Sequence, residues 1–138
     1  MNQPTAPNLQ IMLIDNDKYV RESMSVFFQS EAQRFLIFKS AAEGLNSLKY
    51  QEIDIVIADY FLPDMDGLTF LKRVGEHHPG AVRILMATIA NDTLQRDIHL
   101  AGIDSFIEKP LTIAGLDAVL HKLNHAVDSR SDCRGDND

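Results

Sequence analysis

The sequence predicts an α/β fold in which a doubly wound parallel sheet of five strands carries helices on both faces. Two observations predict it. Short apolar runs alternate with segments of helical periodicity along the chain, and these runs are almost continuously hydrophobic. Continuous hydrophobicity is typical of strands that are covered on both faces, as in parallel sheets. Repeated strand–helix units then require right-handed crossovers between parallel neighbours.

The apolar runs are short and rich in branched and aromatic residues. They are Leu9–Ile14, Phe35–Phe38, Ile53–Ala58, Ile84–Ala87 and Ser105–Ile107. Each run alone is a weak indication of a strand, because runs this short also occur in helices. The regular alternation with helical segments therefore carries the assignment.

The first three helical segments begin at recognisable capping residues. Asp17 is placed to cap a segment whose apolar residues, Val20, Met24, Phe27 and Phe28, fall at helical spacing. The second segment opens with the capping-box pattern of Ser40 and Glu43. The third begins near Asp66-Gly67, and its apolar residues also repeat with the helical period.

The fourth and fifth helical segments are bounded by other signals. The fourth starts near Asn91 and ends at Gly102, since glycine adopts the left-handed conformation that closes many helices. The fifth follows Pro110, with Thr112 as its predicted cap. Between the third segment and the next strand, residues 77–80 (His-His-Pro-Gly) predict a solvent-exposed turn.

Composition narrows the classes of function. The chain has 138 residues, enough for one compact domain, with a net charge of −7 and a pI near 5.1. An acidic chain is not expected to bind nucleic acid or an anionic membrane directly, because both need a cationic patch. A single cysteine, Cys133, and the absence of a signal-like segment in Met1–Gln10 predict a cytoplasmic protein.

Polar side chains follow four of the predicted strands. They are Asp15-Asn16-Asp17, Asp59, Thr88 and Lys109. Because the carboxyl ends of parallel strands meet at one edge of the sheet, we expect these side chains to lie close together. Phosphoryl transfer to a protein carboxylate needs an acceptor oxygen, a divalent cation and donors for the remaining phosphoryl oxygens. This group of residues can supply the acceptor, cation ligands and donors.

The motifs around these residues resemble those of response regulator receiver domains, which belong to the CheY-like superfamily. Residues 54–67 (DIVIADYFLPDMDG) resemble the family's phosphorylation motif, with Asp59 in the acceptor position. Asp15-Asn16-Asp17 resembles its acidic pocket, and residues 84–88 and 106–110 resemble its threonine and lysine segments. The resemblance covers roughly residues 9–125. It implies a flavodoxin-like (βα)5 fold with strand order 2-1-3-4-5.

The resemblance implies a role for each matching residue. Asp59 would accept a phosphoryl group from a sensor histidine kinase, a phosphotransfer protein or a small phosphodonor. Asp15, Asn16, Asp59 and the main-chain carbonyl of Phe61 would hold Mg²⁺. The ammonium of Lys109 would contact the phosphorylated or free carboxylate of Asp59.

The same resemblance implies a switch. Thr88 would move toward the phosphoryl oxygens, and Phe106 would change rotamer into the space released. The surface formed by the fourth helix, fifth strand and fifth helix would then control a downstream partner, an output domain or a phosphorylation-dependent homodimer. The chain would not be an enzyme beyond assisting its own phosphoryl transfer and dephosphorylation. The Lys109–Pro110 peptide bond would be cis.

The sequence departs from the family pattern at the second acid after the first strand, which is Asn16. An amide oxygen can coordinate Mg²⁺ but brings no charge, so weaker Mg²⁺ affinity is predicted. Asp17 could supply the charge that Asn16 lacks, but its position is better suited to capping the following helix. Phe61 and Ile89 are bulky apolar residues next to the site. We expect them to hinder attacking water and to lengthen the phosphorylated state.

Two alternatives stay open at this point. A pseudo-receiver would act as an interaction module with impaired phosphorylation, which only Asn16 favours. A haloacid-dehalogenase-like phosphatase would use Asp15 as its nucleophile, but Thr88-Ile-Ala-Asn91-Asp92 lacks the acidic pair that such enzymes need.

The expected domain organisation is an N-terminal extension over 1–8, a receiver domain over 9–126 and a polar tail over 127–138. The tail is too short for an output domain. The chain is therefore either a stand-alone receiver or the receiver part of a longer regulator.

Overall fold

The computed structural model describes residues 9–28, 34–88, 91–119 and 121. The strands are β1 (Gln10–Ile14), β2 (Arg34–Phe38), β3 (Ile55–Asp59), β4 (Val82–Ala87) and β5 (Ser105–Glu108). The helices are α1 (Lys18–Phe28), α2 (Ala41–Leu48), α3 (Gly67–His77) and α4 (Asp92–Leu100), and residues 113–119 are also helical. Strands and helices alternate as the sequence predicts.

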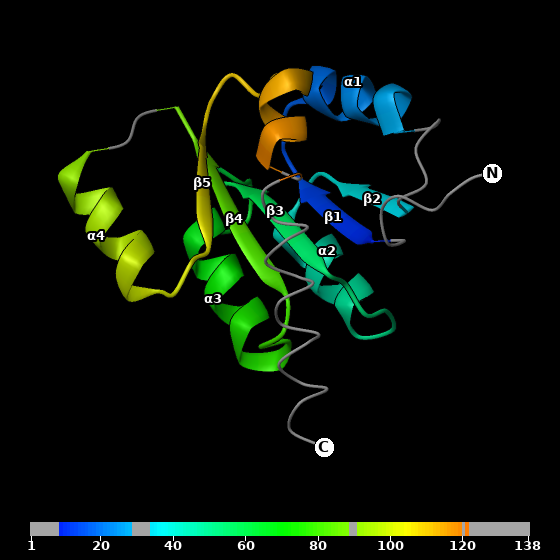
Figure 1. Ribbon diagram of the computed structural model, residues 1–138. Helices are drawn as coiled ribbons and strands as arrows, with labels where there is room; N and C mark the ends of the chain where they lie inside the picture. Colours follow the sequence, from blue (N-terminus) through cyan, green and yellow to red (C-terminus); the bar gives the residue numbers. More distant parts are fainter. Residues whose placement is uncertain (1–8, 29–33, 89–90, 120, 122–138) are drawn as a thin grey trace.

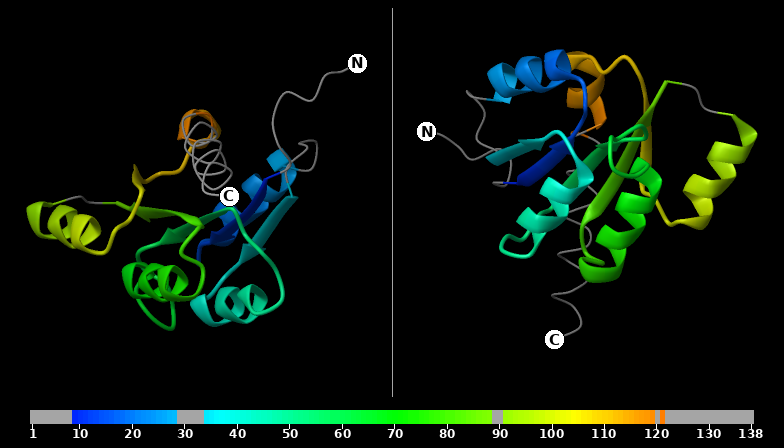
Figure 2. Two further views of the ribbon diagram at one scale, coloured as in Figure 1. Left: turned by 60° about the horizontal axis from the view of Figure 1, so that its bottom comes forward. Right: turned by 180° about the vertical axis from the view of Figure 1, so that it is seen from behind.

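All neighbouring strands pair in parallel, in the order β2-β1-β3-β4-β5. Helix α1 and the helical residues 113–119 cover one face of the sheet, and α2, α3 and α4 lie on the other (Figures 1 and 2). This is the predicted doubly wound architecture with the predicted strand order. Among the described residues, no helix is both long and apolar enough to cross a membrane.

The two faces of the sheet have separate hydrophobic cores because side chains alternate along a strand. In β1, Ile11 and Leu13 pack with α1 and with Leu116, whereas Met12 and Ile14 pack with α2 and α3. All four β1 side chains are fully buried. Burial on both faces explains why the strands read as unbroken apolar runs.

The helices begin at the predicted capping residues. Side-chain oxygens of Asp17, Ser40, Asp66, Asn91 and Thr112 accept main-chain N–H groups two or three residues further on, at 2.8–3.3 Å. The capping box of α2 differs in one detail, because the Glu43 side chain accepts from the amide of Lys39 rather than that of Ser40. Gly102 closes α4 with a φ of 73°, a left-handed conformation that glycine adopts without strain.

Every strand differs by one or two residues at an end from the sequence prediction: β1 begins one residue late, β2 one residue early and β3 two residues late, and β5 ends one residue late. β3 runs to Asp59, because Asp59 is in register with Met86 of β4. β4 begins at Val82, two residues early, because Arg83 lies within the ladder opposite Val56. Cys133 lies outside the described residues.

Candidate phosphoacceptor site

Three charged side chains from different strand ends meet at the carboxyl edge of the sheet. The ammonium nitrogen of Lys109 lies 3.3 Å from Oδ2 of Asp15 and 3.2 Å from Oδ2 of Asp59. Asp15 is fully buried, and Asp59 is only 6% exposed. The site therefore contains two largely buried carboxylates that share one cation.

The sheet itself places these side chains. Main-chain hydrogen bonds continue the ladder one residue past β1, β3 and β5: from Asp15 N to Phe38 O, from Tyr60 N to Met86 O, and from Lys109 N to Ala87 O. The Lys109–Pro110 peptide bond is cis, as the family resemblance implies. Parallel strands that end at one level thus bring together residues that are far apart in the sequence.

The charges at the site interact strongly. Burial raises the pKa of Asp15, and the nearby charge of Asp59 raises it further, against the opposing effects of the Asp17 N–H and of Lys109. Burial alone would lower the pKa of Lys109, but the charges of Asp15 and Asp59 outweigh it and raise that pKa. With both carboxylates ionised, two negative charges face one ammonium, so the site attracts a further cation.

Main-chain contacts hold the first acidic residue in place. Oδ1 of Asp15 accepts the amide N–H of Asp17 at 2.8 Å, and the guanidinium of Arg21 donates to the main-chain oxygen of Asp15 at 2.9 Å. Arg21 was not predicted as a site residue. Its contact is made with a main-chain atom, which the pattern of side chains does not indicate.

The loop after β3 folds closely over the end of that strand, at Asp59. The amide of Gly67 donates to the carbonyl of Tyr60 at 2.7 Å, and Phe61 forms a bridge with Asp66. A Cβ atom on Gly67 would collide with the main-chain oxygen of Asp59. Glycine is therefore required at this close approach. Oδ1 of Asp59 also lies 3.4 Å from the amide nitrogen of Phe61.

Asp64, a second residue that the sequence analysis missed, anchors the same loop. Its carboxylate accepts the amide N–H groups of Ala41 at 3.1 Å and Ala42 at 2.8 Å. Both amides belong to the first turn of α2, where helices favour negative charge. The loop after β3 is thus tied to α2, which precedes it by more than twenty residues in the sequence.

Two further predicted site residues, Asn16 and Thr88, lie at strand ends beside this centre. Asn16 is exposed directly after Asp15. Thr88 is exposed at the end of β4 and lines a cavity of about 350 Å³ with Tyr60, Phe61 and Asn91. Ile89 lies outside the described residues.

Phe106 occupies the middle of β5, in register with Leu85 of β4. It is partly buried and packs against the core that includes α3 and α4. The sequence could not distinguish a core aromatic from a switch, and this position is compatible with both. The rotamer change of Phe106 stays a prediction.

The described residues contain no cluster of three or more His, Cys, Asp or Glu side chains that could hold a metal ion. The candidate metal site has two carboxylates, Asp15 and Asp59. A cation here would depend in addition on the neutral oxygens of Asn16 and of the Phe61 main chain. Magnesium accepts such mixed oxygen ligands and retains several waters.

Comparison with known proteins agrees with this fold. The sequence profile of the response regulator receiver domain family matches residues 11–121. A crystal structure of a CheY-like response regulator receiver domain protein from Methanospirillum hungatei has a TM-score of 0.79 and 25% identity, covering 91% of this chain and 98% of that one. The chain belongs to the response regulator receiver domain family.

Curated relatives include longer proteins. A probable C4-dicarboxylate response regulator from Halalkalibacterium halodurans is 29% identical over 83% of this chain, which spans 50% of that protein. A protein-glutamate methylesterase/protein-glutamine glutaminase from Paramagnetospirillum magneticum is 31% identical over 82% of this chain, which spans 31% of that protein. This chain thus spans half or less of the length of these relatives. Residues 11–121 are thus a receiver domain of two-component signalling, and the family match favours this assignment over a haloacid-dehalogenase-like phosphatase.

Proposed function

We propose that Asp59 accepts a phosphoryl group from the phosphohistidine of a sensor histidine kinase or phosphotransfer protein, or from a small phosphodonor. A carboxylate oxygen of Asp59 attacks phosphorus. With phosphohistidine the phosphorus–nitrogen bond breaks and its electron pair stays with the imidazole, which is protonated; with acetyl phosphate the phosphorus–oxygen bond breaks and its electron pair leaves with acetate. The product is an acyl phosphate. The observation that carries the proposal is the ammonium of Lys109, held 3.2 Å from the acceptor carboxylate in a nearly buried site.

Lys109 and Thr88 are the proposed binding groups for the phosphoryl oxygens. A preorganised ammonium stabilises negative charge on these oxygens at little cost in reorganisation. Lys109 comes to this position through contacts with both carboxylates, so it is already oriented before a phosphodonor arrives. Thr88 completes the set from the end of β4, after a movement of its side chain toward the phosphoryl group.

The residues at this edge fit a magnesium ion. Asp15, Asn16, Asp59 and the main-chain oxygen of Phe61 would hold it, because two carboxylates that share one ammonium leave uncompensated negative charge. When bound, Mg²⁺ supplies neutralisation of the charge that develops on the phosphoryl oxygens.

The proposed output is a changed surface over α4, β5 and the helix at 113–119. Thr88 and Phe106 would link this surface to the acceptor, since Thr88 follows β4 and Phe106 lies in β5. A downstream protein, an output domain or a second phosphorylated copy would bind this changed surface. Four further expectations stay predictions. They are the domain boundaries at 8/9 and 126/127, the cytoplasmic location, the lack of direct nucleic acid or membrane binding, and the lack of further enzymatic activity.

The acceptor role is tested by phosphorylation with acetyl phosphate and Mg²⁺, read on a phosphate-affinity gel and by mass spectrometry of the modified peptide. We expect one acid-labile phosphoryl group on Asp59 and none in Asp59→Asn. Asp54→Asn is the matched control, since Asp54 precedes the same strand at its opposite end and its side chain accepts the amide N–H of Gln10. No modification of the wild type would favour the pseudo-receiver, and label on Asp15 would revive the phosphatase.

A further inference from the structure

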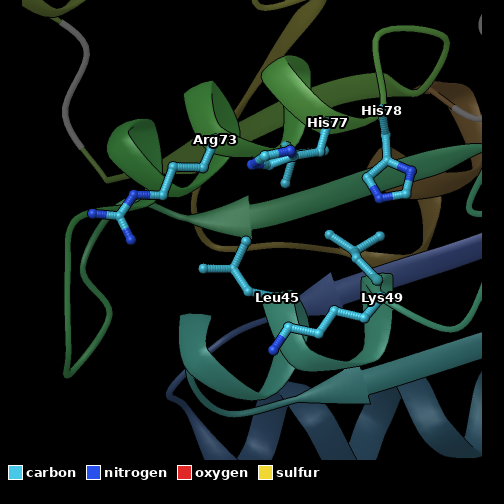
Figure 3. Close-up of a pocket in the computed structure, with 7 residues that line it drawn as sticks. Leu45, Lys49, Arg73, His77 and His78 are labelled. Atoms are coloured by element: carbon cyan, nitrogen blue, oxygen red, sulfur yellow. The ribbon is translucent and has the colours of Figure 1, made fainter.

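A second concave site lies between α2 and α3, near the ends of both helices. It has a volume of about 570 Å³. Its lining residues are Leu45, Leu48 and Lys49 from α2 and its cap, and Arg73, Val74, His77 and His78 from α3 and its cap. Figure 3 shows the two groups facing each other across the gap. We call this site the α2–α3 groove.

The groove combines an apolar floor with a basic rim. Leu48 and Val74 are buried and Leu45 is partly buried, so the floor is hydrophobic. The charged or chargeable lining residues, Lys49, Arg73, His77 and His78, are all basic, and no acid lines the groove. Within the part of the chain that the structure describes, no salt bridge involves any of them. The rim therefore contrasts with a chain whose net charge is −7.

Helix capping accounts for part of this arrangement. Lys49 caps α2 and His77 lies in the last turn of α3, where cations favour the negative end of the helix dipole. The dipole does not require the cations of two helices to face one cavity. It also does not account for Arg73, which lies a turn before the end of α3, or for the leucines and valine between the cations.

We propose that the α2–α3 groove binds a small amphipathic anion, with an apolar aromatic or aliphatic body and a carboxylate or sulfonate group. The body would lie on Leu45, Leu48 and Val74, and the acidic group would reach the Lys49 and Arg73 side chains. The volume falls in the range of small-molecule sites, which are mostly apolar with a few polar anchors.

The groove is distinct from the phosphoacceptor site. Helix α3 begins at Gly67, beside Asp59, and reaches the groove at Arg73. A rise of about 1.5 Å per residue puts the groove residues of α3 roughly 9–15 Å along the helix from its start. Binding in the groove can thus be measured on the unphosphorylated chain, independently of the proposed phosphorylation.

The test uses 8-anilinonaphthalene-1-sulfonate as the probe and the full chain labelled with ¹⁵N. We expect saturable shifts of the amide resonances of Leu45, Leu48 and Val74. N-phenyl-1-naphthylamine shares the aromatic body but lacks the sulfonate, and it should bind about tenfold more weakly, since it gains nothing from the basic rim. Equal binding of the two compounds would overturn the proposal, as would shifts confined to another surface or no binding at all.

Charge removal gives a second test that leaves the floor intact. The double variant Lys49→Gln/Arg73→Gln should raise the dissociation constant of the sulfonate about tenfold, because each exposed rim charge contributes modestly. Lys72→Gln is the matched control: Lys72 adjoins Arg73 on α3 and lines a separate pocket with Arg83 and Leu100. The dissociation constant of the sulfonate for Lys72→Gln should equal that for the wild type. An unchanged constant in the double variant, with its spectrum still that of the folded chain, would contradict the proposed anion contact.

Discussion

The ammonium nitrogen of Lys109 lies 3.3 Å from Oδ2 of Asp15, although 94 positions separate the two residues in the sequence. The same nitrogen lies 3.2 Å from Asp59. Two carboxylates thus share one cation in a largely buried site. Removal of this cation leaves both acids without their partner, and this has a measurable consequence for stability.

We expect Lys109→Met to lower the free energy of unfolding at pH 7 by about 1–3 kcal/mol, because buried acceptors lose their donor. Added Mg²⁺ should restore part of the loss, since it supplies positive charge to the same carboxylates. Urea denaturation followed by circular dichroism measures both effects.

The double variant Lys109→Met/Asp15→Asn is the control for this explanation. It removes one of the two unpaired charges, so its loss of stability should be smaller than the sum of the two single changes. A strictly additive result would mean that the contact between Lys109 and Asp15 contributes nothing to folding.

Asn16→Asp should strengthen Mg²⁺ binding. The substitution keeps the size of the side chain and adds one negative charge next to Asp15. At a partly exposed site an added charge contributes on the order of 1 kcal/mol, which corresponds to about a fivefold to tenfold lower dissociation constant. Calorimetric titration with MgCl₂ gives the comparison, and equal affinities would show that the missing acid does not limit the site.

Asp17→Asn separates capping from metal binding. The carboxylate of Asp17 accepts the Tyr19 amide at 2.8 Å, which confirms its predicted capping role. Asparagine caps helices about as well as aspartate, so the variant should keep both its stability and its Mg²⁺ affinity. A clear fall in Mg²⁺ affinity would instead assign the second acid of the site to Asp17.

Asp64 makes the attachment of the acceptor loop to α2 dependent on pH. Burial opposes its ionisation, but the N–H groups of Ala42 and Ala41 outweigh this effect and hold its pKa below the ordinary value of 3.8. A lowered pKa in the folded state means stabilisation that is present above pH 3.8 and lost as the pH falls through the lowered value.

We therefore expect Asp64→Asn to be less stable than the wild type at pH 6 by about 0.5 kcal/mol, a modest amount because the carboxylate is exposed. The difference should shrink as the pH is lowered below 3.8. Urea midpoints of both proteins between about pH 2.5 and 6 test this. A difference that stays constant with pH would mean that the charge of Asp64 has no part in the attachment.

The centre of the site could be predicted because it depends on topology. Asp15, Asp59 and Lys109 each follow or end a strand, and parallel strands must end at one edge. Arg21 and Asp64 could not be predicted, since they bind main-chain groups whose proximity arises only after the helices pack. A side chain at a strand end can be identified from the pattern of strands in the sequence. A contact between a side chain and the main chain of another element cannot be identified in this way.

The limits of β4 show the same dependence on packing. Arg83 interrupts the apolar pattern, so the sequence predicted a strand from Ile84. In the structure its guanidinium donates to the carbonyls of Leu71 at 3.0 Å and Gly102 at 3.0 Å, which compensates the charge inside the strand. His77 likewise belongs to α3 rather than to the predicted turn. Local periodicity in the sequence predicts neither the hydrogen bonds of Arg83 nor the place where α3 ends.

Phe61 is expected to slow hydrolysis of the acyl phosphate. Its side chain is 70% exposed beside the acceptor, and its ring packs edge-on against Tyr60 at a centroid distance of 5.0 Å. An apolar ring here excludes water without orienting it, whereas an amide can hydrogen-bond an attacking water. Phe61→Asn should therefore shorten the phosphoryl half-life several-fold, measured on phosphate-affinity gels after the phosphodonor is removed.

Tyr50→Asn is the control for this prediction. It changes another aromatic residue, which is 80% exposed, and should leave the half-life unchanged. Equal half-lives in wild type and Phe61→Asn would exclude Phe61 as the cause of a slow reaction.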